Sequence, residues 1–285
     1  MRAICLLLLL SLAPSLSSAG GLIERFPPSL QQGGVGYVRV RASPLPQGSF
    51  GKTPLYFFPH PDGGYGALVG VDLALPPGSY PLKMKVGGRS YSLPWRVKKT
   101  PFGVQRLTLP QRMVELRGEI LERVKRERRM LKEILSTVNR RSFLKGPLVA
   151  PLQGRISSAF GLRRIINGRY RYSHSGVDIA APAGTPVKAC GDGVVVLSRA
   201  LYLEGNTIII DHGLGLYSLY LHLQSFVVKE GEEVRAGQVI GKVGSTGRAT
   251  GPHLHWGVKL MGQRVDPFSL LRLLRGQVFS SPEGK

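Results

Sequence analysis

Cysteine is almost absent from this 285-residue sequence, which contains only Cys5 and Cys190. Cys5 lies in an N-terminal apolar stretch that we expect to be removed, so Cys190 has no second thiol with which to form an internal disulfide. Cys190 follows a strand-like stretch in which a small thiol packs well, and we predict that it is buried and structural. A catalytic thiol is the alternative interpretation, but residues elsewhere in the chain that are typical metal ligands are better candidates for a catalytic site.

Long hydrophobic runs are absent after the first twenty residues. Arg2 precedes the apolar residues 4–12, Pro14 interrupts the run, and the small residues 17–19 suit cleavage by signal peptidase. The run is shorter than the roughly 20 apolar residues of a membrane span. We therefore predict a signal peptide at residues 1–19 and an exported, soluble or peripheral protein. The periplasm is the expected compartment, the cell wall or the extracellular space are the alternatives, and a retained membrane anchor is the competing interpretation.

Acidic residues are scarce, with 17 Asp and Glu against 39 Lys and Arg, and the formal net charge is +22. Loss of residues 1–19 removes one arginine and no acid, which lowers this charge by one to +21. An exported protein of this charge is attracted to anionic wall polymers or lipid headgroups. Nucleic acid is not expected as a partner, because the sequence has no combined basic and aromatic binding motif. A basic surface without a dedicated ligand is the open alternative, and the oligomeric state is not predicted.

The first part of the mature chain, residues 20–105, reads as a small β-domain. Short alternating runs at residues 37–41 and 82–86 are typical of strands with one buried face. Turn signals such as Gly87 followed by Gly88 separate these runs. The pattern predicts an N-terminal β-sandwich-like domain.

Residues 106–145 change to helical periodicity and predict a connector. Thr108 and Gln111 form a candidate capping box at its start. We expect an amphipathic helix that joins two domains and packs on one of them, with a coiled-coil dimer seam as the alternative. The apolar residues that recur at steps of three, four and seven are Met113, Leu116, Ile120, Val124, Leu131, Ile134 and Val138.

Residues 146–275 return to short, glycine-rich strands and are followed by a tail at residues 276–285. No helix-length amphipathic window interrupts the strands, so parallel βαβ units are not expected. The predicted fold is therefore mostly β: an antiparallel β-sheet catalytic domain, a smaller N-terminal β-sandwich-like domain and a connecting amphipathic helix. The predicted strands include residues 194–197, 207–210, 216–220 and 234–240.

Histidine is also scarce, yet five of the six histidines lie within residues 174–255. His174 and Asp178 belong to the segment HSGVD, and both are residue types that bind zinc. Four residues of extended strand span about 13 Å, which is too far for one ion, so we expect the chain to bend at Gly176.

A second segment, GPHLH at residues 251–255, holds a pair of histidines. Strand alternation places His253 and His255 on one face, about 7 Å apart, with Leu254 directed to the core. One histidine of the pair is then available to a metal and the other to the substrate or a water, and the spacing does not say which. His222 ends an apolar strand and joins these segments as a candidate catalytic residue.

Two histidines and one carboxylate leave one coordination position for water, as in catalytic zinc sites. Zinc lowers the pKa of bound water from about 15.7 to about 7, and a further histidine can transfer protons and stabilise developing charge. The residues therefore predict amide hydrolysis with one Zn²⁺ ion. Non-haem iron oxygenases use the same ligand types but place their first pair closer together than His174 and Asp178. Cupin-type sites have an acid a few residues after the His-x-His pair, and this acid is missing after His255. A helical His-Glu-x-x-His motif is also absent.

Residues 146–268 resemble the LytM/lysostaphin family of zinc peptidoglycan endopeptidases. The resemblance implies zinc on His174, Asp178 and His255, with His222 and His253 beside the metal handling protons and oxyanion charge. The stretches that carry the resemblance are SAFG at 158–161, HSGVDIA at 174–180, PAGTPV at 182–187, YLHL at 220–223, GSTG at 244–247 and GPHLH at 251–255.

The same resemblance implies a structural role for His212, in the strand-end turn DHG. Arg163, Asn206 and Thr246 are further candidates for lining the substrate groove. The implied function is a secreted zinc-dependent endopeptidase that hydrolyses peptide bonds in peptidoglycan through a metal-activated water. The alternative is a catalytically silent or self-covered wall-binding protein that regulates other wall hydrolases, with the N-terminal domain or the segment 108–140 covering the groove.

Overall fold

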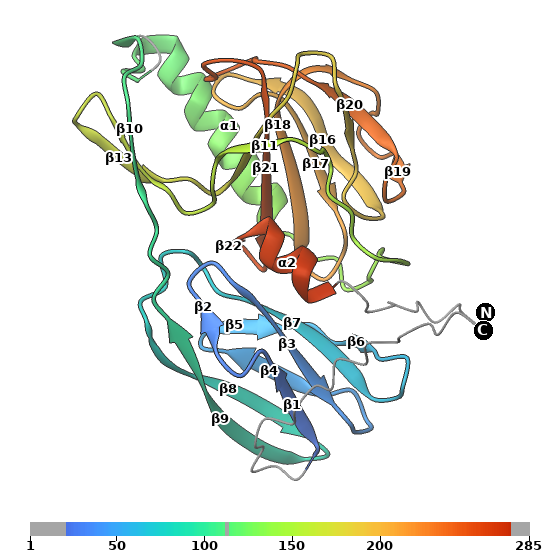
Figure 1. Cartoon of the computed structure of the whole chain (residues 1–285). Helices are drawn as coiled ribbons and strands as arrows, with labels where there is room; N and C mark the ends of the chain where they lie inside the picture. The colour runs from blue at the N-terminus through green and yellow to red at the C-terminus, as the bar shows by residue number, and fades with distance from the viewer. Residues whose placement is uncertain (1–20, 112–113, 275–285) are drawn as a thin grey trace, which may run out of the picture.

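The computed structural model describes residues 21–111 and 114–274, whose strands form two β-rich units, one above the other in Figure 1. The lower unit contains strands β1–β9, and the upper unit contains β11–β22. The predicted signal peptide with Cys5, the residue Met113 and the predicted tail lie outside the described residues. The expected mostly β fold with antiparallel sheets is confirmed. Within residues 21–111 and 114–274, no helix is long and apolar enough to span a membrane.

The N-terminal unit packs two sheets face to face, in the strand orders β1-β3-β7-β6 and β2-β9-β8-β4-β5. Buried and exposed residues alternate along β8 and β9, and this alternation places Leu82 and Trp95 in the core between the sheets. The β8–β9 hairpin turns at Gly87 and Gly88, whose φ angles of 55° and 79° favour glycine. The strands are β1 Ile23–Phe26, β2 Leu30–Gln31, β3 Val35–Val40, β4 Gln47–Phe50, β5 Thr53–Leu55, β6 Phe58–Pro59, β7 Tyr65–Gly70, β8 Gly78–Val86 and β9 Arg89–Lys98.

The C-terminal unit is built on a large antiparallel sheet with the order β11-β14-β21-β18-β17-β16-β19. Strands β15, β20 and β22 extend it, and β12 and β13 form a separate hairpin. Its core includes Tyr220, Leu254 and Trp256, none of which is exposed. The elements are β11 Arg155–Ser158, β12 Arg163–Ile166, β13 Tyr170–Ser173, β14 Gly176–Ala180, β15 Pro186–Lys188, β16 Gly193–Leu201, β17 Gly205–Asp211, β18 Leu216–Phe226, β19 Glu233–Val234, β20 Val239–Val243, β21 His253–Leu260, β22 Gln263–Val265 and the helix α2, Pro267–Leu274.

Two local predictions for this unit are wrong. The run at residues 234–240 is not one strand, because a turn separates β19 from β20. The backbone N–H of Gln238 donates to the carbonyl of Arg235 at 3.0 Å, and Gly237 has a φ of 82°. The eight-residue helix α2 was also not predicted, because its length of about two turns gives little periodicity.

The connector contains a short strand, β10 (Val104–Leu107), and the helix α1 (Gly118–Ser136). The predicted capping box at Thr108 and Gln111 is wrong, because α1 begins ten residues after Thr108 and has no side-chain cap. Tertiary hydrogen bonds explain the difference: Asn167 binds the backbone N–H and C=O of Leu109, at 2.9 and 3.0 Å. These bonds and the parallel pairing of β10 with β12 hold the segment extended against its local pattern.

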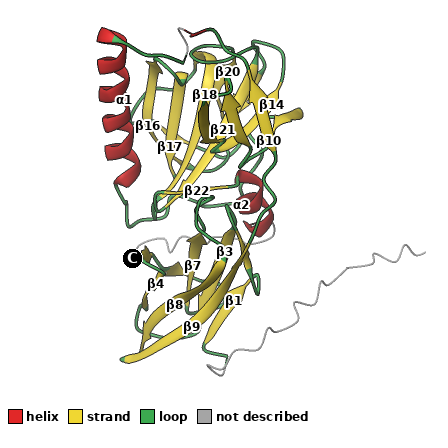
Figure 2. Ribbon diagram, turned by 90° about the vertical axis from the view of Figure 1, so that its left-hand side faces the viewer, coloured by secondary structure: helices red, strands yellow, loops and turns green. Residues whose placement is uncertain are grey.

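Helix α1 lies along the C-terminal unit beside β16 and β17 (Figure 2). Its Leu135 packs into a small cluster with Leu197, Ile209 and Tyr217 of the sheet. The expectation that the helix packs on one of the two domains is therefore confirmed.

The N-terminal unit contacts the C-terminal unit at α2, β22 and the Leu260 end of β21. Asp72 accepts hydrogen bonds from the guanidinium of Arg264, at 2.6 and 3.0 Å, and from its backbone N–H at 2.9 Å. The backbone N–H of Asp266 donates to the carbonyl of Gly33 at 2.7 Å. The N-terminal unit is thus attached at the end of β21 that lies away from its two histidines.

Replacing Asp72 by asparagine is expected to lower the free energy of unfolding by about 1–3 kcal/mol, because charged hydrogen bonds between the units are lost. Burial alone would raise the pKa of Asp72, but the hydrogen bonds from Arg264 outweigh it and hold the pKa below its ordinary value. A carboxyl with a lowered folded-state pKa stabilises the fold above its unfolded pKa, and this stabilisation is lost as the pH falls through the folded value.

The difference between wild type and Asp72→Asn should therefore be full at neutral pH and shrink in acid, which denaturant unfolding across that range measures. Asp62→Asn is the control, because Asp62 is 73% exposed and its ion pair with Arg39, at 3.4 Å, contributes little. Equal losses for the two variants, or a difference that does not change with pH, would contradict the prediction.

Candidate metal centre and active site

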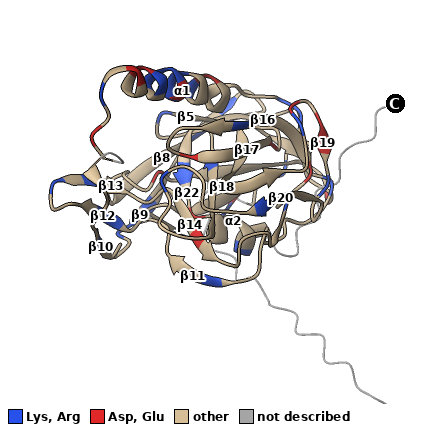
Figure 3. Ribbon diagram, turned by 90° about the horizontal axis from the view of Figure 1, so that it is seen from above, with Lys and Arg blue, Asp and Glu red and all other residues tan. Residues whose placement is uncertain are grey.

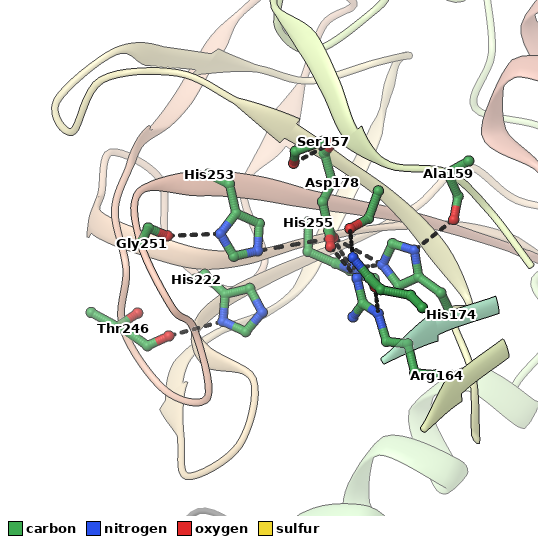
Figure 4. A network of polar contacts seen from close by, with 12 residues as sticks. Ser157, Ala159, Arg164, His174, Asp178, His222, Thr246, Gly251, His253 and His255 are labelled. Atoms are coloured by element: carbon green, nitrogen blue, oxygen red, sulfur yellow. Dashed lines mark hydrogen bonds and ion pairs between the residues drawn. The ribbon is translucent and has the colours of Figure 1, made fainter. Parts of the chain in front are cut away.

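Three side chains, two from neighbouring strands and one from the residues that precede β14, converge on one point (Figure 4). Strands β14 and β21 pair so that Asp178 lies directly opposite His255, and His174 enters from the residues just before β14. The Nε2 of His174 lies 2.9 Å from Oδ1 of Asp178 and 3.0 Å from Nδ1 of His255. The latter two atoms are 2.8 Å apart. The structure thus brings together the three residues predicted to bind metal.

This donor set fits a zinc ion. Two imidazole nitrogens and one carboxylate oxygen are the ligands of many catalytic zinc sites, which keep a fourth position for water or substrate. In tetrahedral coordination with bonds of about 2.0–2.1 Å, ligand atoms lie roughly 3.3 Å from one another. The three ligand atoms of this chain are already 2.8 to 3.0 Å apart, so small side-chain movements are enough to hold an ion.

The protonation states of these side chains also suit metal binding. The Nδ1–H of His174 donates to the carbonyl of Ala159 at 2.8 Å, which leaves the Nε2 lone pair directed at the cluster. Burial opposes ionisation of Asp178, but the close polar contacts of its carboxylate with the imidazoles of His174 and His255 outweigh burial and hold its pKa well below the usual range. Burial lowers the pKa of His255, which favours the neutral imidazole that binds metal.

Gly176 has a different role from the predicted bend. It is the first residue of β14, and its φ is not positive, so the chain does not bend there. The residues outside any strand are the two before it, His174 and Ser175. A Cβ atom on Gly176 would lie 2.7 Å from Nε2 of His255 and 2.5 Å from the carbonyl oxygen of Trp256. Glycine is therefore required because the imidazole of a ligand passes directly over the backbone.

Arg164 is a site residue that the sequence did not reveal. Its guanidinium donates to Oδ2 of Asp178 at 2.5 Å and to Oε1 of Gln105 at 2.8 Å. The amide of Gln105, on β10, donates in turn to Oγ of Ser158 at 3.2 Å. Arg163 was the predicted groove residue, but consecutive strand residues face opposite sides, and its guanidinium donates to Phe102. The two arginines are adjacent in the sequence, and nothing in the sequence indicates which of them contacts Asp178.

Replacing Arg164 by glutamine is expected to weaken zinc affinity by about 10–100-fold, because the outer-shell partner that orients Asp178 is lost. Arg163→Gln is the matched control and should leave affinity unchanged, since its side chain lies on the other side of β12. Competition with a chromogenic chelator measures both variants. An Arg164→Gln protein with wild-type affinity would show that the ligand carboxylate does not need this arginine.

His222 and His253 lie beside the three metal-ligand candidates. The ring centroids of His222 and His253 are 4.9 Å apart, and those of His222 and His255 are 6.2 Å apart. The Nδ1–H of His222 donates to the carbonyl of Thr246, and that of His253 donates to the carbonyl of Gly251, both at 2.8 Å. Each ring is therefore oriented through Nδ1 with its Nε2 left available to the site, and Nε2 of His253 lies 3.9 Å from Oδ1 of Asp178.

A β-bulge explains how His222 reaches the site. Strict alternation along β18 would place it on the core face with Tyr220, which is fully buried. The register between β17 and β18 shifts at this point, and His222 adopts a φ of 63°. The bulge turns the imidazole toward His253 and His255. Burial, followed by the charges of His255 and His253, lowers the pKa of His222 to about 3, so its imidazole is neutral at neutral pH.

The remaining predicted residues have supporting positions. His212 is 2% exposed, donates from Nδ1 to the carbonyl of Asp192 at 2.7 Å and lies 2.7 Å from Oγ of Ser218, as a structural role requires. Cys190 is buried. Asn206 donates from its side chain to the carbonyl of Gln224 at 3.1 Å. Thr246 contributes its backbone carbonyl to orient His222, a role that residue type alone does not indicate.

Comparison with known proteins finds a family model that covers the site residues and relatives that match part of the chain. Residues 172–267 match the model of peptidase family M23. The chain is 50% identical over 117 residues to the DD-carboxypeptidase/endopeptidase Mpg of Neisseria meningitidis serogroup B, an alignment that covers 41% of this chain and 27% of that protein. It is 47% identical over 113 residues to the peptidoglycan DD-endopeptidase ShyA of Vibrio cholerae, covering 39% and 26%. The chain thus spans about a quarter of the length of these relatives.

One solved structure is similar over nearly the whole chain. It comes from Pseudomonas aeruginosa and is described as an M23 peptidase, with 31% sequence identity and a TM-score of 0.69. The match covers 90% of this chain and 97% of that structure, so it includes both β-rich units and the connector between them.

Proposed function

Because the chain belongs to peptidase family M23, we propose that it is an exported zinc endopeptidase that hydrolyses peptide bonds in bacterial peptidoglycan. One observation carries the proposal: His174, Asp178 and His255 meet within 3.0 Å of one another, and His222 and His253 lie beside them. No other arrangement of titratable groups in the described residues offers three metal-ligand side chains together.

Zinc would be held by Nε2 of His174, Oδ1 of Asp178 and Nδ1 of His255. When bound, it supplies Lewis acidity, which lowers the pKa of a water and polarises a carbonyl. The chain keeps these ligands in their binding states, because Ala159 fixes the tautomer of His174 and Arg164 occupies the second oxygen of Asp178. One carboxylate oxygen therefore remains directed at the two imidazoles.

His222 and His253 would carry the protons. Attack of water on the peptide carbonyl forms a carbon–oxygen bond and releases a proton, which the free Nε2 of His222 accepts. The Nε2–H of that histidine then protonates the leaving nitrogen as the carbon–nitrogen bond breaks, giving a carboxylic acid and an amine, which exchange a proton to become a carboxylate and an ammonium group. His253, held by the carbonyl of Gly251, would stabilise the charge that develops on the carbonyl oxygen when its Nε2 also carries a proton and can donate it.

Two observations support the choice of substrate and compartment. The Vibrio cholerae relative, which is 47% identical to this chain over 113 residues, is named a peptidoglycan DD-endopeptidase. Residues 1–19 have the composition of a signal peptide, which supports export to a compartment where the cell wall is accessible, and the periplasm is the proposed one.

Mass spectrometry of soluble muropeptides released from purified walls tests the proposal. The mature protein loaded with zinc should release cross-link fragments, and the masses of new ends should identify the bond. His174→Ala should release none, because the ligand set is incomplete. Equal release by both proteins, or no release by either one, would overturn the assignment as an endopeptidase.

A further inference from the structure

A groove of about 530 Å³ continues from the metal-ligand candidates along the face of the sheet. Residues of β17, β18 and β21 line its floor, and residues of α1 line the side beside them. His255 and Lys259 both line it, and Lys259 lies four residues further along β21 than His255. The wall is contributed by residues outside the segment 172–267 that matches the family model.

The strand geometry sets the length of the groove. His255, Gly257 and Lys259 alternate along β21 and face the same side, and Leu221 and Leu219 of β18 lie opposite the first two. Four residues of strand span about 13 Å. An extended peptide of about four residues that starts at the metal centre would therefore end beside Lys259.

Lys259 is half-buried and has no hydrogen bond or ion pair within residues 21–111 and 114–274. The nearby carboxylate of Asp72 is already bound by Arg264. Burial, followed by the charge of Arg264, lowers the pKa of Lys259. An ammonium group that has lost part of its hydration without gaining a partner is stabilised by an anion at this position.

The side of the groove that is formed by α1 also carries positive charge, as Lys259 does. Arg128 and Lys132 lie four residues apart on one face of α1, both are exposed, and neither forms an ion pair in the described part of the chain. In Figure 3 more of the ribbon of this helix is blue, for Lys and Arg, than red, for Asp and Glu. Glu204, whose pKa is raised by burial, is the one acidic residue among those that line the groove.

We propose that this groove binds the acidic stem peptide of the substrate, with Lys259 taking its terminal carboxylate and the α1 cations taking a side-chain carboxylate. The identity of that peptide rests on the proposed function. The ligand chemistry rests on the groove itself: an apolar floor for an extended backbone, an unpaired cation about four residues of strand from His255, and further unpaired cations on α1.

Binding of a peptidoglycan tetrapeptide to the mature protein tests this subsite without requiring catalysis. The peptide is used with its carboxylates free or converted to carboxamides, and affinity is measured by calorimetry. Wild type should bind the carboxylate form at least tenfold more tightly than the carboxamide form, since a charged hydrogen bond contributes about 1.5–3 kcal/mol. Lys259→Gln should weaken binding of the carboxylate form about tenfold or more and leave binding of the carboxamide form unchanged.

Two further variants are controls for a general loss of structure. Lys242→Gln removes an exposed lysine outside the groove and should bind as wild type does. Lys259→Arg keeps the charge and should restore most of the affinity. Equal affinity of Lys259→Gln and wild type, or equal binding of the two peptide forms by wild type, would overturn the subsite. Selective binding without cleavage of cell walls would support the subsite and contradict the proposed function. Cleavage of cell walls without selective binding would support the proposed function and contradict the subsite.

Discussion

Replacing His222 by alanine is expected to lower the rate of peptide hydrolysis by about 10²–10⁴-fold, because the general base is lost. Zinc affinity should stay at the wild-type value, since His222 is not among the three side chains that meet at the metal centre. Initial rates on a defined cross-linked muropeptide, together with zinc content by atomic absorption, measure the two effects separately.

The neighbouring histidine provides a comparison for this result. His253→Ala should also lower the rate, and the double variant should lose little more than the worse single variant, because both residues act on one transition state. His60→Ala is the control, since His60 lies in the N-terminal unit between β6 and β7. A His222→Ala protein that retains more than a tenth of the rate, or that loses zinc, would contradict the role of His222 as base.

Strand alternation predicted much of the fold and part of the site. The period-two pattern located strands in both units, and it placed His253 and His255 on one face with Leu254 in the core. The pattern depends only on the direction of successive side chains, so it is readable from any regular strand. It failed at residues 234–240, where a four-residue turn preserves the apolar spacing but not the strand.

The positions that escaped prediction depend on contacts between segments far apart in sequence. The region around Thr108 has helical spacing, yet β12 and Asn167 hold it extended. The orientation of His222 depends on a bulge relative to β17, and the choice of Arg164 over Arg163 depends on which side of β12 faces Asp178. Local sequence does not contain these partners.

The connector therefore does more than link the two units, because it also contributes residues to the site. Gln105 of β10 binds the guanidinium of Arg164, which binds the carboxylate of Asp178, and α1 forms a wall of the groove beside His255. A shortened chain that starts after α1 would lose both contributions. This arrangement favours a connector that helps to build the site over one that only covers it, and the N-terminal unit is attached at the other end of β21.

Adding a single methyl group at Gly176 is expected to weaken zinc affinity and slow hydrolysis by about 10²-fold or more. A Cβ atom there would lie 2.7 Å from Nε2 of His255 and 2.5 Å from the backbone oxygen of Trp256, closer than real contacts allow. The oxygen belongs to the paired strand β21, so the strain is relieved by moving the His255 ring or the strand that carries it. Either movement displaces one of the three atoms that meet at the metal centre.

Chelator competition and thermal unfolding of the metal-free protein separate the local effect from a general one. Gly176→Ala should lower zinc affinity much more than the overpacking cost of about 1–3 kcal/mol lowers stability. Gly146→Ala is the matched control, because a Cβ at Gly146 has no atom within 4 Å and should change neither quantity. Wild-type zinc affinity in Gly176→Ala would mean that the metal centre tolerates movement of His255, and the requirement for glycine at this position would then have to lie in the pairing of β14 with β21 alone.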